Sequence, residues 1–302
     1  MPVAARSWYV ESVRLSSRDS PATAGSLDDE QALMDQSNWV PEEVPLDRPN
    51  VARMWDYFLG GAHNFAVDRE AAEQAIKLYP DVRLVAQTNR ALLRRAVQFL
   101  IASGIKQFLD IGSGIPTAGN VHEIAQRANP DARVVYVDIE PVAVAHSRAI
   151  LQDVPTATVI QADARHPDEL VNHPEVRRML DWTQPIGVLL LALLHFVPDD
   201  AEALRIVRTL REAMPSGSYL VITHGTTEQL EEAGAQVEQL YRGATSPIHF
   251  RTREQITRFF EGFELVEPGL VYVPLWRPES EDDLLLDNPH RSNGYAGVGR
   301  KP

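Results

Sequence analysis

From Gly104 onward, short apolar runs alternate with longer amphipathic stretches along the chain. The expected strands are 107–111, 134–138, 158–161, 186–194, 219–223, 263–267 and 295–299. Helical patterns of about ten or more residues lie between most of these runs, and short turns connect them. Strands joined by crossover helices form a parallel sheet covered on both faces. The sequence therefore predicts an α/β fold with a mostly parallel sheet.

Three helical patterns come before this alternation. The first runs from Pro49 to the pair Gly60-Gly61, and proline is favoured in the first turn of a helix. The second follows Asp68, an N-cap candidate, and the third spans 81–103. We therefore expect a helical cap or lid over residues 49–103, followed by a ligand-binding domain over residues 104–302.

Residues 1–48 are rich in serine, proline and acidic side chains and show no sustained periodicity. Such composition predicts a loosely ordered arm. A second methionine, Met34, stands just before the first patterned segment, so residues 1–33 are expected to be dispensable.

Composition excludes several classes of protein. The chain has no cysteine, which rules out disulfides, thiolate metal sites and a thiol nucleophile. Its formal net charge of -13 opposes binding to the phosphate backbone of nucleic acids. The longest apolar run, 186–197, is too short to cross a membrane, and no secretory signal is recognised, so a cytoplasmic location is expected. The histidines form no H-x-x-x-H pair, so no metal site is expected.

Ligands of open parallel sheets bind at the carboxyl ends of the strands. The first strand ends in Asp110 and a turn containing Gly112 and Gly114, where the backbone approaches a ligand closely. The second ends in Asp138, placed to accept hydrogen bonds from a ribose diol, or alternatively to cap the next helix. The third ends in Asp163, which suits the exocyclic amine of adenine, although aspartate is also an ordinary turn residue.

The glycine turn does not suit a dinucleotide. Thr117 stands where the third glycine of G-x-G-x-x-G belongs, and no basic residue lies between Gly112 and Asn120. The turn therefore favours an adenosine ligand without phosphates. S-adenosylmethionine (SAM), whose product form is S-adenosylhomocysteine (SAH), is such a ligand, and Asp110 would orient its amino group.

These residues resemble class I SAM-dependent methyltransferases, and most closely a bacterial family named S-adenosyl methyltransferase. The resemblance covers roughly residue 39 to the end. It rests on the segments 48–65, 68–69, 89–90, 107–117, 194–199 and 294–301. The family resemblance implies a Rossmann-like sheet of seven strands with the last antiparallel. It also implies SAM over the glycine turn, with Ser113 in the turn and Ala164 beside Asp163. Ile139 departs from this family, in which the position is often polar, and is the apolar residue type that packs on adenine in methyltransferases generally.

The helix over 81–103 adds a geometric prediction. It is expected to run antiparallel to the first strand, and Asp110 lies six residues past Gly104. At about 3.3 Å per strand residue and 1.5 Å per helix residue, Asn89 and Arg90 come level with the glycine turn. Arg90 would then meet the methionine carboxylate of SAM, unless both residues belong to a solvated helix turn.

Candidate catalytic groups are fewer. His195 follows the fourth strand and is a candidate general base, although histidines there are often hydrogen-bonded core residues. His224 ends the fifth strand and is a candidate lining residue of the acceptor pocket. Tyr57 and His63 are further candidate catalytic residues within a segment that folds either as a lid or as a structural cap. The other candidate lid residues of this segment are Gly60, Gly61, Asn64 and Phe65.

We therefore expect a SAM-dependent methyltransferase that acts on a small-molecule acceptor. The absence of an Asn/Asp-Pro-Pro-Tyr/Phe motif favours oxygen over nitrogen as the methylated atom. The main alternative is a SAM- or nucleoside-binding sensor without catalysis. A nicotinamide-dependent oxidoreductase is disfavoured by Thr117. The oligomeric state is not predicted.

Overall fold

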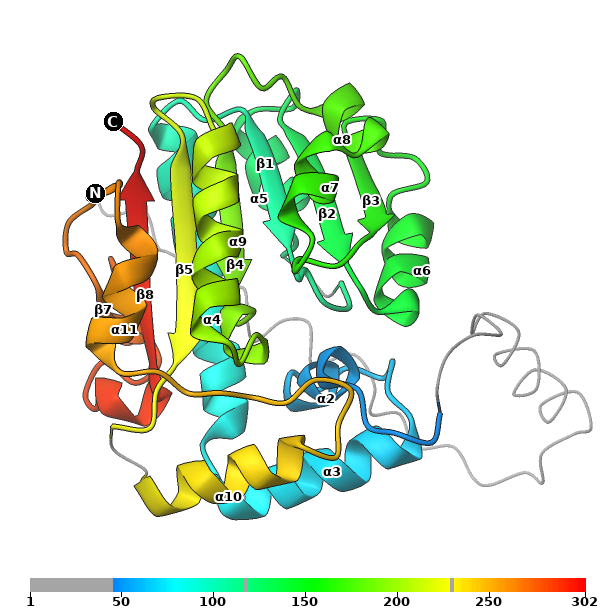
Figure 1. Ribbon diagram of the computed structural model, residues 1–302, viewed down its shortest axis with the longest axis vertical. Coiled ribbons are helices and arrows are strands. Elements are labelled where there is room, and N and C mark those ends of the chain that lie inside the picture. Colours follow the sequence, from blue (N-terminus) through cyan, green and yellow to red (C-terminus); the bar gives the residue numbers. More distant parts are fainter. Residues whose placement is uncertain (1–45, 117–118, 229–230) are drawn as a thin grey trace, which may run out of the picture. The chain divides into compact units, whose positions relative to one another are not determined.

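The fold centres on an eight-stranded mixed sheet (Figure 1). A computed structural model describes residues 46–116, 119–228 and 231–302, which form one compact unit. The strands are β1 (Gln107–Ile111), β2 (Arg133–Asp138), β3 (Ala157–Gln161), β4 (Gly187–Leu191), β5 (Tyr219–Gly225), β6 (Glu264–Leu265), β7 (Val271–Tyr272) and β8 (Gly294–Arg300). Their order across the sheet is β3-β2-β1-β4-β5-β8-β6, and β7 also pairs with β8.

Strands β1 to β5 are parallel, and β8 lies antiparallel beside β5. This confirms the predicted Rossmann-like sheet with an antiparallel last strand. One detail differs, because the edge strand consists of two short pieces, β6 and β7, which both pair with β8. Pro268 and Gly269 separate the pieces: proline lacks a backbone N–H, and Gly269 turns back to Val266 with a left-handed φ of 86°.

Helices cover both faces of the sheet. The α-helices are α2 (Val51–Phe58), α3 (Ala66–Leu78), α4 (Val82–Ala102), α5 (Val121–Ala128), α6 (Pro141–Ile150), α7 (Pro167–Asn172), α8 (Pro174–Met179), α9 (Asp200–Ala213), α10 (Glu231–Tyr241) and α11 (Arg253–Thr257). Short 3-10 helices are η2 (Leu194–Phe196), η3 (Arg258–Phe260), η4 (Val273–Leu275) and η5 (Pro289–Ser292).

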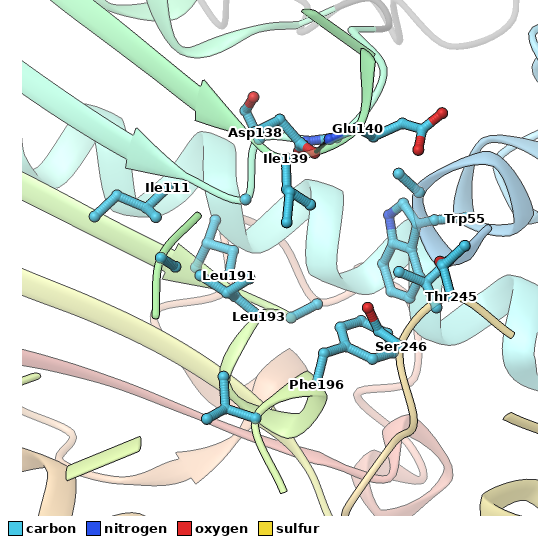
Figure 2. A pocket seen from close by; sticks show the side chains of 18 of the residues that line it. Trp55, Ile111, Asp138, Ile139, Glu140, Leu191, Leu193, Phe196, Thr245 and Ser246 are labelled. Atoms are coloured by element: carbon cyan, nitrogen blue, oxygen red, sulfur yellow. Dashed lines mark hydrogen bonds between the residues drawn. The ribbon is translucent and has the colours of Figure 1, made fainter. Parts of the chain in front are cut away.

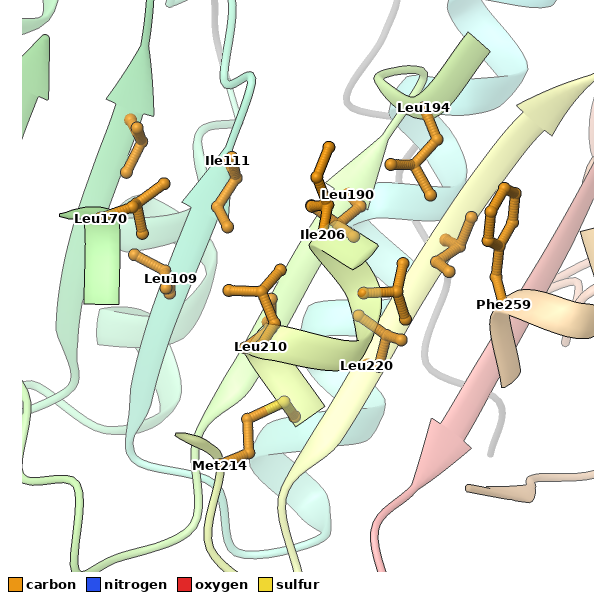
Figure 3. Close-up of a cluster of buried hydrophobic side chains, with 14 of the residues drawn as sticks. Leu109, Ile111, Leu170, Leu190, Leu194, Ile206, Leu210, Met214, Leu220 and Phe259 are labelled. Carbon is orange, nitrogen blue, oxygen red and sulfur yellow. The ribbon is translucent and has the colours of Figure 1, made fainter. Parts of the chain in front are cut away.

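Alternation along β1 assigns its side chains to two cores. Leu109 and Ile111 join the cluster formed with α7, α8, α9 and α11 (Figure 3). Phe108 belongs to the opposite cluster, which contains residues of α4 and α5 such as Leu100 and Ile124. Because side chains alternate along a strand, Asp110 lies on the same face as Phe108, toward α4.

A third cluster joins α2, α3 and α10. These helices lie across the end of the sheet toward which β5 points, so they cover the carboxyl ends of the parallel strands (Figure 1). Met54 and Phe58 of α2 are buried there with Ala72 of α3 and Tyr241 of α10. The expected boundary at Gly104 therefore does not separate two cores, because α4 belongs to the layer that covers the sheet.

Two predicted boundaries shift. Strand β4 ends at Leu191 rather than at residue 194, and Ala192 has a left-handed φ of 51°, so His195 lies in the 3-10 turn η2. Helix α3 begins at Ala66, and Asp68 accepts a hydrogen bond from the Phe65 N–H from inside its first turn instead of capping it.

No helix in the described ranges is long and apolar enough to cross a membrane. Residues 1–45 of the predicted arm over 1–48, with Met34, and the position of Thr117 lie outside the described residues.

Candidate functional site

A cavity of ≈ 530 Å³ lies at the carboxyl ends of the parallel strands (Figure 2). Ligand pockets of proteins commonly enclose about 300–1,000 Å³, so this cavity has room for a nucleoside-sized ligand. Its lining comes from the glycine turn after β1, the ends of β2, β3 and β4, the helices α2 and α4, and the segment 245–247. The predicted cofactor residues that line it are Asn89, Arg90, Asp110, Gly112, Ser113, Gly114, Asp138, Ile139, Asp163 and Ala164.

The turn after β1 brings backbone to the cavity wall. The N–H of Gly112 donates to the carbonyl of Val137 at 2.8 Å, which joins the turn to β2. Gly112 has a φ of 73°, and a Cβ there would stand 2.7 Å from Cδ1 of Leu193. A side chain at this position would be strained and would also push Leu193 aside.

Asp138 connects the glycine turn to the end of β2. Its Oδ2 accepts the N–H of Gly114 at 2.7 Å, and its Oδ1 accepts the N–H of Glu140 at 2.9 Å. Burial raises the pKa of Asp138, although the backbone hydrogen bonds oppose this shift. Each carboxylate oxygen can accept a second hydrogen bond, so Asp138 can order the turn and still receive a ligand hydroxyl.

Ile139 presents an apolar surface to the cavity, with about half of its side chain exposed (51%). Figure 2 shows Trp55 and Phe196 across the cavity from it. Asp163 also lines this region, but its carboxylate is paired with the Arg165 guanidinium at 2.7 Å. A ligand amine would therefore share the Asp163 carboxylate with Arg165.

Arg90 and Asp110 lie below the glycine turn. Burial raises the pKa of Asp110 to about 7, the positive charge of Arg90 opposes this rise, and the negative charge of Asp138 adds to it. Arg90 is positioned by a hydrogen bond from its Nη2 to Oδ1 of Asn120 at 3.2 Å. The predicted level of Arg90 on α4 thus agrees with where the structure places it.

A second cavity, ≈ 110 Å³, adjoins the first. The two cavities share the lining residues Val51, Trp55, Asn89, Ala192 and Phe196. Asn89 is oriented by the Thr223 hydroxyl, which donates to its Oδ1 at 2.7 Å. A compound in the second cavity therefore lies next to a ligand in the first.

Both strand-end histidines line the second cavity. Burial lowers the pKa of His195 to about 3, and Arg251 adds to this effect. His224 is also held neutral by burial, which lowers its pKa well below the usual value. Its Nδ1 lies 2.8 Å from the carbonyl of Gly225, and its Nε2 lies 3.0 Å from a guanidinium nitrogen of Arg251. Both ring nitrogens of His224 are thus engaged by the protein.

The catalytic and lid residues predicted in segment 57–65 lie outside the described lining of both cavities, although Phe58 of the same segment lines the second one. The Tyr57 hydroxyl donates a hydrogen bond to Glu73, and the His63 ring packs at a tilt against that of His146 with ring centroids 3.9 Å apart. Neither Tyr57 nor His63 belongs to the described lining of the two cavities, and the same holds for Gly60, Gly61, Asn64 and Phe65.

A buried carboxylate, Asp56, explains this segment. Its Oδ2 accepts the N–H of His63 at 2.9 Å and the side-chain amide of Asn64 at 2.8 Å. A Cβ at Gly61 would stand 2.0 Å from Oδ1 of Asp56, so the glycine permits close packing rather than a hinge. The segment is a structural turn between α2 and α3.

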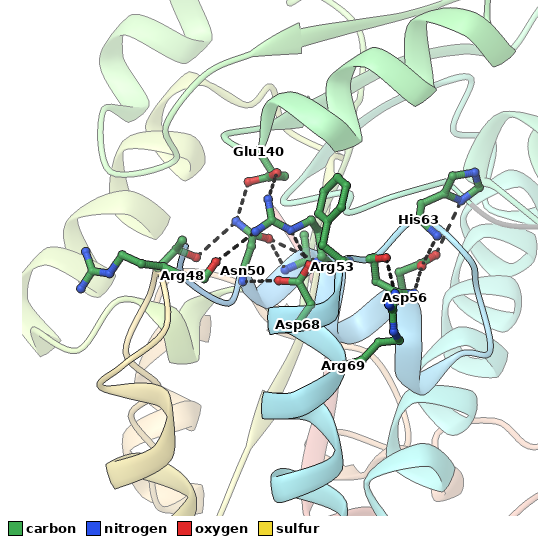
Figure 4. Close-up of polar contacts among 12 residues, drawn as sticks. Arg48, Asn50, Arg53, Asp56, His63, Asp68, Arg69 and Glu140 are labelled. Carbon is green, nitrogen blue, oxygen red and sulfur yellow. Dashed lines mark hydrogen bonds and ion pairs between the residues drawn. The ribbon is translucent and has the colours of Figure 1, made fainter. Parts of the chain in front are cut away.

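Sequence reasoning missed a buried charge cluster around Arg53 (Figure 4). The Arg53 guanidinium pairs with Asp68 at 2.8 Å and with Glu140 at 3.0 Å, and all three side chains are almost fully buried. Asn50 adds hydrogen bonds to both carboxylates. This cluster joins α2 and α3 to the residue that follows Ile139. The sequence signal for this cluster was Arg53 itself, a charged residue that stands beside Met54 among apolar residues of its helix.

The first cavity fits an adenosine ligand in its chemistry. Asp138 supplies acceptors for ribose hydroxyls, Ile139 supplies an apolar face, and the Ser113 Oγ is buried with no hydrogen-bond partner in the described part of the chain. Asp110 and Arg90 supply a carboxylate and a guanidinium for an amino-acid group.

Comparison with known proteins agrees with this geometry. The family model described as S-adenosyl methyltransferase matches residues 37–302. A candidate methyltransferase from Thermobifida fusca YX is 43% identical, with a TM-score of 0.81 over 87% of this chain and 98% of that one. A DUF574 family protein from Streptomyces avermitilis is 38% identical, with a TM-score of 0.81 over 85% and 99%.

A more distant structure shares the fold. Magnesium protoporphyrin IX methyltransferase from Synechocystis, solved with bound SAH, is 15% identical, with a TM-score of 0.50 over 82% of this chain and 93% of that one. No curated protein matches the sequence.

Proposed function

The chain belongs to the S-adenosyl methyltransferase family, whose cofactor is SAM, and on this premise we propose that it methylates an oxygen atom of a small molecule. The observation that carries this proposal is the pair of adjoining cavities. The larger cavity has the donors and acceptors that SAM requires. The smaller cavity adjoins it, since the two share five lining residues.

When bound, SAM supplies a methyl group on a positively charged sulfur, which is already activated for transfer to a nucleophile. The residues of this chain then have three tasks. Asp138 and the turn from Gly112 to Gly114 hold the nucleoside, while Asp110 and Arg90 hold the amino-acid end. Trp55, Asn89 and Phe196 line the passage between the cavities and align the acceptor. Alignment is the main source of rate enhancement for such a reaction.

Two observations support a small oxygen nucleophile. The smaller cavity holds ≈ 110 Å³, which excludes macromolecular segments from its interior, and the net charge of -13 repels nucleic acids. The chain lacks the Asn/Asp-Pro-Pro-Tyr/Phe motif of many enzymes that methylate amino groups. Oxygen is therefore the proposed methylated atom.

Calorimetric titration with SAM and SAH tests the cofactor site. We expect micromolar binding by the natural protein and a loss of at least about tenfold in Asp138→Ala, because a charged acceptor contributes about 1.5–3 kcal/mol to a hydrogen bond. Asp153→Ala removes an exposed carboxylate elsewhere and serves as the matched control. Its affinity should equal that of the natural protein.

Asp138 also orders the glycine turn, so a second variant separates ligand contact from folding. Ile139→Glu places a carboxylate in the cavity at a half-exposed position, where the fold tolerates it. We expect an unchanged melting temperature and weaker SAH binding. If neither ligand binds the natural protein, the proposal is wrong, and if Ile139→Glu binds SAH normally, the adenosine does not lie at Ile139.

A further inference from the structure

The smaller cavity carries no charged side chain among its described lining residues. It is lined largely by aromatic and aliphatic groups. Apart from the residues that it shares with the larger cavity, these aromatic and aliphatic groups include Phe58, Val82, Val85, Val237, Ile248 and Phe250. Its two histidines are neutral at neutral pH, because burial disfavours their charged forms. A charged acceptor would lose its hydration here without gaining a partner, which disfavours its binding.

The volume of this cavity limits the size of the acceptor. An apolar cavity of about 150 Å³ holds one benzene ring, whereas the present cavity measures ≈ 110 Å³ and shares five lining residues with the larger one. One six-membered ring is therefore the upper size limit, and it fits only if its substituent extends toward the larger cavity. Two fused rings do not fit without displacement of the aromatic walls.

His195 supplies a polar group in these apolar surroundings. The N–H of Gly225 donates to its Nδ1 at 3.4 Å, which makes Nδ1 the acceptor of the neutral ring and leaves the proton on Nε2. No protein group in the described part of the chain accepts a hydrogen bond from this Nε2. The ring is also a weak base, since its protonated form is disfavoured by burial and by Arg251.

We propose that the smaller cavity is the acceptor subsite and selects an uncharged compound with a single aromatic ring, whose hydroxyl oxygen accepts a hydrogen bond from Nε2 of His195. This inference rests on the proposed function and names its substrate class. His195 is then a hydrogen-bond donor that positions the oxygen and not the general base, and the hydroxyl proton passes to water as the O–CH₃ bond forms and the S–CH₃ bond breaks.

Phenol is the simplest probe of this proposal, measured by ligand-observed NMR and calorimetry on the SAH-loaded protein. Benzoate has the same ring with a negative charge, and 2-naphthol has the same hydroxyl on two rings. We expect phenol to bind at least about tenfold more tightly than either compound. A tenfold difference corresponds to about 1.4 kcal/mol, which an unpaired charge or a steric clash in the cavity would supply.

The outcomes separate this inference from the proposed function. If SAH fails to bind, the proposed function fails. If SAH binds and phenol does not, or benzoate binds as well as phenol, the acceptor class is wrong and the cofactor assignment stands. If 2-naphthol binds equally, the single-ring limit is wrong.

Two variants of His195 test its role as a donor. His195→Gln keeps an N–H donor of similar reach, whereas His195→Leu keeps volume and removes it. We expect phenol affinity within about threefold of the natural value in the glutamine variant and about a tenfold loss in the leucine variant. Benzene, which has no oxygen, should bind both variants equally. A purely structural role of His195 would not make phenol, but not benzene, discriminate between the two variants. Equal loss of phenol in both variants would overturn the donor assignment.

A cavity-filling variant tests the location. Val85 of α4 lines only the smaller cavity, so Val85→Phe should abolish phenol binding and leave SAH affinity unchanged. Val67→Phe, on α3 and outside the described lining of both cavities, is the matched control and should leave both ligands unaffected. Phenol binding that survives in Val85→Phe would place the acceptor elsewhere.

Discussion

The surroundings of the Asp110 side chain disfavour its ionised form. It lies fully buried beside Arg90 and near Asp138, and burial raises its pKa to about 7. Because the folded pKa exceeds the ordinary value of about 3.9, its contribution to stability is fully present below about pH 4 and is lost as the pH rises through 7. A ligand ammonium group has the opposite preference, since it pairs with the ionised carboxylate.

We therefore predict that SAH binds about tenfold more tightly at pH 8 than at pH 6, the range over which Asp110 changes from mostly protonated to mostly ionised. Asp110→Asn cannot ionise and should remove this change while binding more weakly at pH 8. Asp138 also has a raised pKa, and the asparagine variant separates the two contributions. Titrations at three pH values measure the effect, and an equal slope in Asp110→Asn would assign it to another group.

Some of the site residues could be predicted because parallel strands bring their carboxyl ends to one edge of the sheet. Asp110, Asp138 and Asp163 were identified in this way, and each lines the larger cavity. Trp55 and Arg53 were not, because their place depends on how α2 packs across the sheet, which no local pattern specifies. For the same reason, no local pattern specifies that His63 packs against His146 and lies outside the described lining of both cavities.

At the scale of elements, the helices α2 and α3 are attached to the sheet through a buried ion-pair cluster. Arg53 of α2 pairs with Asp68 of α3 and with Glu140, the residue before α6. A buried pair owes its stability to complete compensation of charge, so removal of one partner leaves uncompensated charges in an apolar environment.

We predict that Arg53→Met lowers the free energy of unfolding by about 3–5 kcal/mol, since two buried carboxylates lose their common cation. Urea denaturation measures this change. Arg83→Met is the matched control, because Arg83 pairs with Glu73 at 3.5 Å while both side chains are nearly half exposed. Its effect should be less than about 1 kcal/mol. Equal losses in the two variants would show that the cluster contributes no more than a surface pair.

The order of the elements followed from the sequence because each strand is a short apolar run and each crossover has helical periodicity. The end of β4 did not, because the apolar run continues through Leu193 and Leu194, beyond the point where Ala192 leaves the strand conformation. Apolar residues in a 3-10 turn and in a buried strand look alike in a sequence. The place of His195 in η2 therefore depends on the tertiary fold.

At the scale of the whole molecule, the family match begins at residue 37, and all described lining residues of both cavities come from residue 50 onward. The described members of the three hydrophobic clusters also begin after that point, with Val51. The described residues that carry the fold and the site thus lie C-terminal to Met34.

We therefore predict that a chain of residues 34–302 keeps the properties of the full chain. Its melting temperature should lie within a few degrees of the full-length value, because a change of 1 kcal/mol shifts the melting temperature of a large domain by only about 2–4 °C. Its affinities for SAH and for phenol should be unchanged, as no described contact to either cavity is removed. Scanning calorimetry and the titrations above measure all three quantities. A chain that loses SAH affinity at an unchanged melting temperature would assign a direct part in the cofactor site to residues 1–33.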